Sequence, residues 1–159
     1  PELIIDHKYV FNRIGWNLKP LDLQAAIGLE QLKKLEYICK TRQSNKDAIQ
    51  ASLKKYVNGV NFPNTFVETD WVPFGVPIVC ESKQQKEKLV SFLEKNGVQT
   101  RNYFAGNLLV HKGYKHLDDY KKYPESNKVL DLVFFVGCAP TISQDNLNHI
   151  ENILSLWKN

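Results

Sequence analysis

The sequence predicts an α+β fold, in which a small, mostly antiparallel sheet carries helices on one side and follows long helices. From residue 72 onward the predicted elements run strand, helix, strand, strand, helix, which is an order typical of an α+β layer. Ahead of them, between residues 20 and 56, apolar positions recur with the helical period. The 159 residues are 43% hydrophobic and 24% charged, so the chain can bury a core of ordinary composition.

Long helices are predicted over residues 20–35 and 37–56. The apolar residues of the first helix recur four, four and three positions apart, on one helical face: Leu21, Ala25, Leu29 and Leu32. Pro20 is expected at the first helical position, where its missing N–H costs little, and Asp22 at the third. The Asn58-Gly59 pair stops the second helix, so a domain boundary is predicted near that helix end.

The rest of the chain alternates strands with helices. Strands are predicted over three ranges: Phe74–Cys80, Val98–Thr100 and Asp131–Cys138. Helices are predicted over three more: Lys83–Lys95, Pro124–Leu130, and the segment that follows Ser143 as its N-cap. Residues 60–72 are predicted to be a loop or an edge strand, and residues 111–123 an irregular loop. Pro77 indicates an edge or irregular position in its strand, because proline has no N–H to donate to a ladder.

A polar turn precedes the first helix. In it, Asn17 supplies an amide donor and Lys19 an ammonium group beside the helix N-terminus, where an anion such as phosphate can bind. An ordinary helix start with a solvated lysine is the alternative. Arg13 lies just before the turn and can meet a phosphate or carboxylate through two hydrogen bonds, or form only a surface salt bridge.

A second motif spans Thr100–Leu108. Arg101 stands at the end of a predicted strand, where a guanidinium suits a carboxylate or a diphosphate. Asn107 follows in a turn with Gly106 and can both donate to and accept from sugar hydroxyls. A structural, hydrogen-bonded turn is the alternative for this segment.

Charge and cysteine usage argue against several classes of function. The net charge of +4 comes from scattered lysines without an arginine-rich run, which disfavours nucleic-acid binding. The three cysteines are far apart and form no CxxC pair, which favours free thiols in a reducing cytoplasm over a metal site. No apolar run approaches the roughly 20 residues of a membrane span, and no signal peptide is expected. The start at Pro1 and the lack of methionine indicate a piece of a longer protein.

The first motif resembles a hallmark segment of the sugar-nucleotide aminotransferase family: Gly-Trp-Asn-Leu-Lys, then Asp22, then Gln24–Leu32. The resemblance implies a pyridoxal-phosphate enzyme of fold type I, of which this chain is the C-terminal part. Residues 1–19 are then a remnant of the large domain with the cofactor-phosphate loop, residues 20–56 interdomain helices, and residues 57–159 the small domain. It also implies a homodimer whose active site is shared across the interface, with Asn17 reaching the cofactor phosphate there.

The second motif is similar to the 3-dehydratase branch of this family, through its pattern Thr-Arg-x-x-Phe-Ala-Gly-Asn-Leu. These enzymes remove the C3 hydroxyl of nucleotide-linked 4-keto-6-deoxyhexoses for lipopolysaccharide O-antigens, with pyridoxamine phosphate as coenzyme. In them a histidine replaces the cofactor-binding lysine, and either residue is expected upstream, so no catalytic residue is expected in this chain. The resemblance implies that Arg13, Arg101 and Asn107 contact the sugar nucleotide or an amino-donor carboxylate, and that Phe104 packs beside the sugar.

Two other functions stay open. One is transamination of the same class of substrate by an upstream lysine. The other is a stand-alone binding domain without chemistry. The chain departs from the usual family pattern at three places, which leaves the exact substrate open: Pro20-Leu21, Lys112–Tyr114 and Val136–Pro140.

Overall fold

The computed structural model describes residues 20–64, 70–104 and 106–158 of the chain. The chain divides into two compact units, residues 1–35 and 36–159, which we describe separately. The predicted cofactor and substrate contacts at Asn17 and Arg13 lie outside the described residues, as does the whole of segment 1–19.

The described part of the first unit is built around helix α1, Asp22–Leu32. Leu21 is its extended N-cap, and the Gln24 side chain accepts a hydrogen bond from the Leu21 N–H at 2.8 Å. Pro20 therefore precedes the cap and Asp22 is the first helical residue, which corrects the prediction. The reason is the Gln24 side chain, which satisfies the Leu21 N–H, makes Leu21 the N-cap and so places the first helical residue two positions beyond the proline. The apolar face of α1 is exposed, and the helix buries none of its residues.

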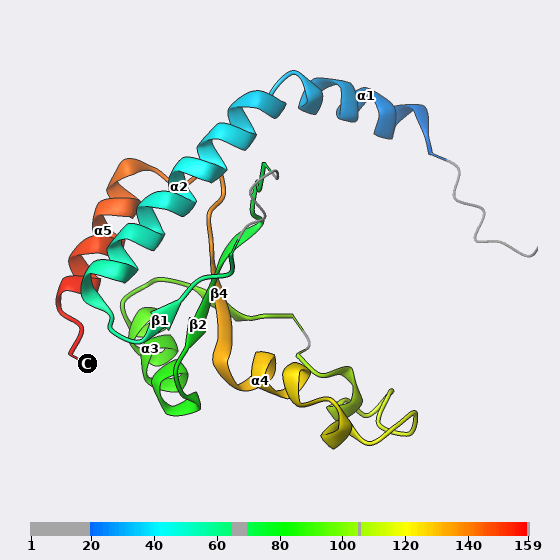
Figure 1. Ribbon diagram of the computed structural model, residues 1–159. Coiled ribbons are helices and arrows are strands. Elements are labelled where there is room, and N and C mark those ends of the chain that lie inside the picture. Colours follow the sequence, from blue (N-terminus) through cyan, green and yellow to red (C-terminus); the bar gives the residue numbers. More distant parts are fainter. Residues whose placement is uncertain (1–19, 65–69, 105, 159) are drawn as a thin grey trace, which may run out of the picture. The chain divides into compact units, whose positions relative to one another are not determined.

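The second unit contains one sheet of four strands in the order β1-β2-β4-β3, with every neighbouring pair antiparallel (Figure 1). The strands are β1 Val60–Asn61, β2 Gly75–Cys80, β3 Thr100–Asn102 and β4 Val133–Gly137. Ile78 lies opposite Phe134 in the β2–β4 pair, and Arg101 lies opposite Phe135 in the β3–β4 pair. The predicted antiparallel sheet is confirmed.

Four helices accompany the sheet: α2 Leu35–Tyr56, α3 Lys83–Lys95, α4 Pro124–Leu132 and α5 Gln144–Ser155. Alternate residues of β2 and β4 form one buried face with side chains of α2, α3 and α5: Ile49, Leu53, Val76, Ile78, Leu89, Leu93, Phe134, Val136, Ile153 and Leu154. This cluster is the core. It confirms that helices cover one side of the sheet, and α2 supplies part of it.

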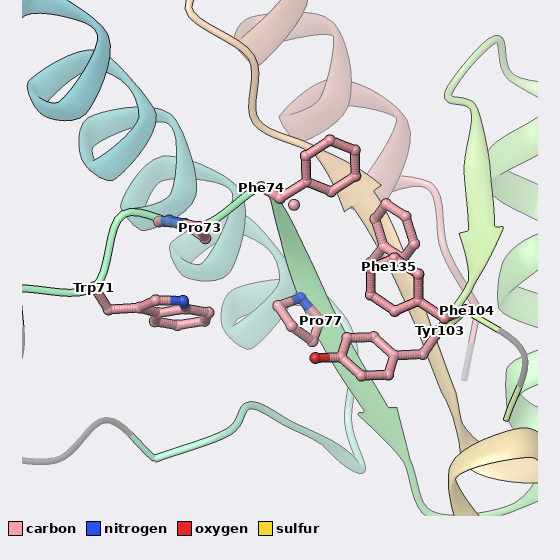
Figure 2. Close-up of a pocket in the computed structure, with 8 residues that line it drawn as sticks. Trp71, Pro73, Phe74, Pro77, Tyr103, Phe104 and Phe135 are labelled. Carbon is pink, nitrogen blue, oxygen red and sulfur yellow. The ribbon is translucent and has the colours of Figure 1, made fainter. Parts of the chain in front are cut away.

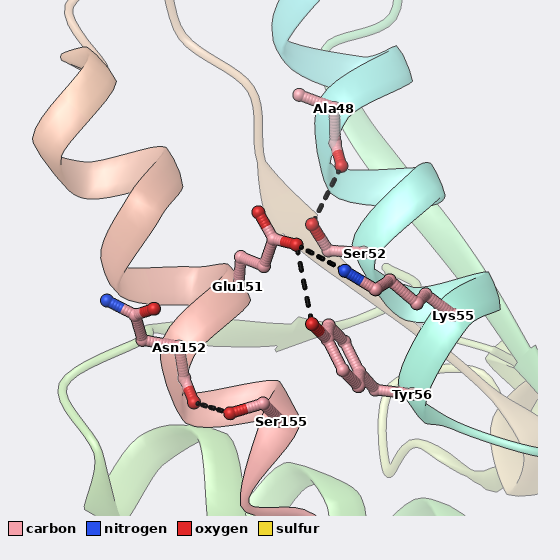
Figure 3. Close-up of polar contacts among 7 residues, drawn as sticks. All are labelled: Ala48, Ser52, Lys55, Tyr56, Glu151, Asn152 and Ser155. Atoms are coloured by element: carbon pink, nitrogen blue, oxygen red, sulfur yellow. Dashed lines mark hydrogen bonds and ion pairs between the residues drawn. The ribbon is translucent and has the colours of Figure 1, made fainter.

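Helices α2 and α5 lie side by side in the second unit (Figure 3). Their ends are joined by an ion pair of 3.0 Å between Lys55 Nζ and Glu151 Oε1, and the Tyr56 hydroxyl donates to the same oxygen at 3.4 Å. The lysine lowers the pKa of the Glu151 carboxyl. Because the ion pair is largely exposed, the apolar contacts beneath it carry most of the stabilisation.

Local signals predicted both ends of α3 and the start of α5. Helix α3 has its predicted bounds, and α5 begins after Ser143, whose hydroxyl accepts a hydrogen bond from Asn146 N at 3.2 Å. The strand predicted over Val98–Thr100 is placed two residues too early, since β3 begins at Thr100. Val98 does not pair with β4, because its N–H donates to Leu93 O at 2.9 Å and closes the end of α3.

Pro77 lies in β2, which runs between β1 and β4 and is therefore an interior strand of the sheet. The prediction of an edge position is wrong for the strand as a whole. However, β1 pairs only with Val79 and Cys80, so at Pro77 the described ladder has a partner on the β4 side alone. The proline is tolerated there because β1 does not extend as far as Pro77, so no ladder hydrogen bond on that side requires an N–H at this position.

Within the described residues, no helix is both long and apolar enough to cross a membrane.

Candidate active-site face

The sheet face opposite the core carries a shallow hollow of about 170 Å³, which we call the aromatic pocket (Figure 2). Its walls come from the segment before β2, from β2 itself, from the end of β3 and from β4. The residues that line it are Trp71, Pro73, Phe74, Gly75, Pro77, Tyr103, Phe104 and Phe135. Antiparallel register brings them together, because residues that alternate along paired strands share a face.

Phe135 is the centre of this pocket. Its ring centroid lies 5.9 Å from that of Phe74, 6.4 Å from that of Tyr103 and 6.0 Å from that of Phe104. Phe74 and Phe104 are nonetheless 70% and 71% exposed. The rings therefore form a surface that is ordered by mutual contact yet open to a ligand.

Gly75 lets the Phe135 ring lie against the β2 backbone. A Cβ at Gly75 would stand 2.5 Å from Phe135 Cδ2 and 2.9 Å from Val136 O. Both distances are below van der Waals contact, so only glycine fits beneath the ring. The floor of the pocket thus depends on this position.

The segment that carries the predicted substrate contacts forms the rim of the pocket. Phe104 adopts a φ of 50°, which is costly for a residue with a side chain. Gly106 follows with a φ of 61°, and a Cβ there would approach Leu130 Cβ to 2.7 Å. The loop therefore turns sharply against helix α4, and the turn presents Phe104 at the pocket (Figure 2).

Arg101 stands on the same sheet face, directly across from Phe135 in the β3–β4 register. Its side chain is exposed and makes no hydrogen bond or ion pair with any residue that the structure describes. The pKa of Glu94 is lowered mainly because Thr100 donates to that carboxylate from both its N–H and its hydroxyl, and the charge of Arg101 adds to the effect. A guanidinium is thus available beside an aromatic surface.

Asn107 is placed differently, because its side chain is only 3% exposed. Its amide nitrogen donates to Tyr120 O at 3.2 Å and to Asn127 Oδ1 at 2.8 Å, and its Oδ1 accepts from Leu109 N at 3.0 Å. Every polar atom of the side chain is engaged inside the protein. This geometry is that of the structural turn weighed as the alternative, and a substrate contact through Asn107 stays a prediction.

Two further side chains hold the walls of the pocket from behind. Arg42 Nη1 of α2 donates to Phe74 O at 3.2 Å and to Pro73 O at 3.4 Å, and the Cys138 thiol donates to Pro73 O at 3.3 Å. Burial raises the pKa of Cys138, while the nearby charge of Arg42 acts against that rise. The thiol therefore stays protonated and able to donate.

Lys86 supports the loop from the other side. This side chain is 7% exposed, and its Nζ donates to Leu130 O near the C-terminal end of α4 at 2.7 Å. Burial lowers the pKa of this amine, and the neighbouring Cys80 and Asp131 partly restore it. Since Leu130 also packs against Gly106, the lysine fixes the surface on which the loop turns.

Comparison with known proteins assigns the chain to a family. The sequence matches the DegT/DnrJ/EryC1/StrS aminotransferase family over residues 4–155. The chain belongs to this family. The resemblance found in the sequence is thereby confirmed over nearly the whole chain.

The chain is similar to two curated proteins. A dTDP-4-dehydro-2,6-dideoxy-D-glucose 3-dehydratase of Saccharopolyspora spinosa is 31% identical over 91% of this chain and 32% of its own length. Lipopolysaccharide biosynthesis protein RfbH of Salmonella typhimurium is 29% identical over 91% of this chain and 34% of its own length. The chain thus spans about a third of the length of these relatives.

A solved structure shows the same fold. The chain superimposes on E. coli GDP-4-keto-6-deoxy-D-mannose-3-dehydratase with a TM-score of 0.74 and 22% identity, over 92% of this chain and 38% of that one. This likeness confirms the predicted small domain of a fold-type I enzyme.

For this DegT/DnrJ/EryC1/StrS chain, sequence reasoning singled out Arg101 and Phe104, which the structure brings together on one sheet face. It missed Phe74, Phe135 and Arg42. One signal was available, because the adjacent Phe134 and Phe135 must point to opposite faces of a strand, so one of them had to lie outside the core. Among the described residues no group of three potential metal ligands occurs.

Proposed function

We propose that this chain is the C-terminal part of a pyridoxal-phosphate-dependent enzyme that removes the C3 hydroxyl of a nucleotide-linked 4-keto-6-deoxyhexose. Membership of the family over residues 4–155 supports the cofactor class. The names of two reported similar proteins, each a 3-dehydratase, favour dehydration over transamination. The observation that carries the proposal is the rim of the aromatic pocket, where an exposed guanidinium and an exposed ring flank the same surface.

The described residues of the pocket supply binding and orientation. A hexose ring has apolar faces of C–H groups that pack on aromatic rings, and Phe104 and Phe135 offer such rings. Arg101 offers two parallel N–H donors to a carboxylate or a phosphate. Asn107 contributes by fixing the loop, since its own polar atoms are engaged elsewhere.

The cofactor in this proposal is held by residues outside the described part of the chain. Asn17, which precedes α1 in the sequence, is the proposed contact to the cofactor phosphate across a homodimer interface. When bound in its amine form, the cofactor would supply an amine for the sugar ketone and a ring that holds the electrons of a removed proton until the C3 hydroxyl leaves. The catalytic acid or base is then expected upstream of this chain, in the large domain.

Free cysteines support a reducing location. The three thiols Cys39, Cys80 and Cys138 are unpaired, and burial raises the pKa of Cys80 to about 11. Free thiols suit a reducing compartment such as the cytoplasm, and the two buried ones, Cys80 and Cys138, resist oxidation. We include a cytoplasmic location in the proposal on this ground.

The test is an absorption spectrum of the full-length protein with added pyridoxal phosphate, before and after borohydride. The proposal expects a cofactor that binds but is not fixed covalently by reduction, together with loss of the C3 hydroxyl from a nucleotide-linked 4-keto-6-deoxyhexose. A cofactor fixed by reduction indicates an active-site lysine and supports transamination, the second candidate, which the family description favours. Absence of cofactor binding would overturn both.

A further inference from the structure

A second hollow of about 350 Å³ lies between α2 and the segment that begins with β1. One wall is a stripe of α2 residues four positions apart, Lys46, Gln50 and Lys54, which share one helical face. The other wall and one end are formed by Val60, Asn61, Phe62, Pro63, Asn64 and Trp71. We call this hollow the basic groove. Its volume is within the range of sites that bind small molecules.

The two lysines of the groove each lie over an aromatic ring. Lys46 Nζ is 5.5 Å from the centroid of Trp71, and Lys54 Nζ is 5.5 Å from the centroid of Phe62. Cation–π contacts hold an ammonium in place without neutralising it, so its N–H donors stay available to an anion.

Charge in the groove is unbalanced. Among the residues that line it none is acidic. Lys46 pairs with Asp47 Oδ1 at 2.9 Å, but that carboxylate is 68% exposed and lies outside the lining. Lys54 makes no ion pair within the described residues. The groove therefore attracts a ligand that carries negative charge.

The groove and the aromatic pocket share one wall. Trp71 lines both hollows, so they adjoin at a single indole. Beyond the lysines the groove also offers the side-chain amides of Gln50, Asn61 and Asn64, which donate and accept hydrogen bonds. The pocket thus offers apolar rings, and the groove beside it offers two cations and amides that suit a polar heterocycle.

We infer that the basic groove binds the nucleoside diphosphate part of the substrate, with Lys46 and Lys54 on the phosphates and the sugar in the adjoining aromatic pocket. The inference rests on the proposed function for the identity of the ligand. The two adjoining surfaces suit the parts of a nucleotide sugar, which joins a hexose to a charged diphosphate and a nucleoside. A lysine is a point charge suited to phosphate, whereas the aromatic neighbours suit the rings.

The test uses the full-length protein and calorimetric titration with UDP, GDP and dTDP in parallel. Lys54→Gln and Lys46→Gln are each expected to weaken binding about ten-fold, as loss of a charged hydrogen bond does. Lys40→Gln is the matched control, because it removes the same charge from the same helix at a lysine that pairs with Glu36 outside the groove. Lys46→Arg keeps the charge and is expected to restore most of the affinity, which separates charge from packing.

Turnover separates this inference from the proposed function. The lysine variants are expected to raise KM for the nucleotide sugar about ten-fold with kcat within about two-fold, because they remove binding common to ground and transition states. Nucleoside diphosphate affinity that is unchanged in both variants, or absent from the wild-type protein, overturns the inference. Lysine-dependent binding without turnover of a keto-sugar contradicts only the proposed function. Turnover with an unchanged KM in both variants contradicts only the inference that the groove binds the nucleoside diphosphate.

Discussion

Asn107→Ala tests whether this buried amide is structural. The substitution removes three hydrogen bonds at once. Tyr120 O keeps a partner, since Asn127 Nδ2 also donates to it at 3.1 Å, but Asn127 Oδ1 and Leu109 N lose theirs. Each partly buried group left unpaired costs about 1–1.5 kcal/mol, so the expected loss of unfolding free energy is about 2–3 kcal/mol.

Urea unfolding of the chain, followed by circular dichroism, measures this loss. A drop of this size lowers the urea midpoint by about 1 M for a domain of this length. Asn152→Ala is the control, because Asn152 is an exposed residue of α5, and its substitution is expected to change the free energy by less than about 0.5 kcal/mol. If Asn107→Ala is as mild as the control, the structural reading of this turn is wrong and a direct substrate contact regains support.

Three other substitutions test the site and its supports. Gly75→Ala is expected to destabilise the fold by about 1–3 kcal/mol, because its Cβ would meet the Phe135 ring at 2.5 Å; a melting temperature equal to that of the wild type would contradict the tight packing. Phe104→Gly is expected to be more stable than Phe104→Ala by about 1 kcal/mol in urea titrations, since only glycine relaxes a φ of 50°, and equal stabilities would show that the backbone is unstrained. Lys86→Met tests pH dependence. Burial places the pKa of Lys86 in the folded protein below 10.5, so folding disfavours the charged form. The unfolding free energy of the wild type should therefore increase as pH rises from that lowered pKa toward 10.5. The variant should lack this increase. Identical pH profiles of unfolding free energy for wild type and variant would show that Lys86 does not cause it.

Much of the fold was predictable because its signals are local. The Ser143 cap and the amphipathic pattern of residues 83–95 each determine an element within a few positions, and both predictions are confirmed. The strand predicted over residues 98–100 was misplaced because Val98 both closes the end of α3 and packs in the core. A competition between a helix end and a strand start is decided by tertiary packing, which no short pattern reports.

The site was less predictable for a similar reason. Phe104 and Arg101 lie in one continuous motif, so they could be found by resemblance. Phe74 and Phe135 meet only because antiparallel register pairs two strands more than 50 residues apart in the chain. Asn107 could be found in the motif, but its role could not be predicted. An asparagine in a glycine-containing turn suits a buried hydrogen-bond network as well as a sugar, and only its burial in the structure distinguishes these two roles.

The alternation along β2 and β4 has a consequence for how this protein can change. Odd-numbered positions, such as Gly75, Pro77 and Phe135, face the pocket, while Val76, Ile78 and others between them face the core. Replacement at a pocket position can therefore retune ligand preference while the neighbouring core residue is conserved. A single inserted residue in β4 would instead exchange the two sets, burying what should meet the ligand. Diversification of this surface should thus proceed by substitution at every second residue, with the lengths of both strands held constant.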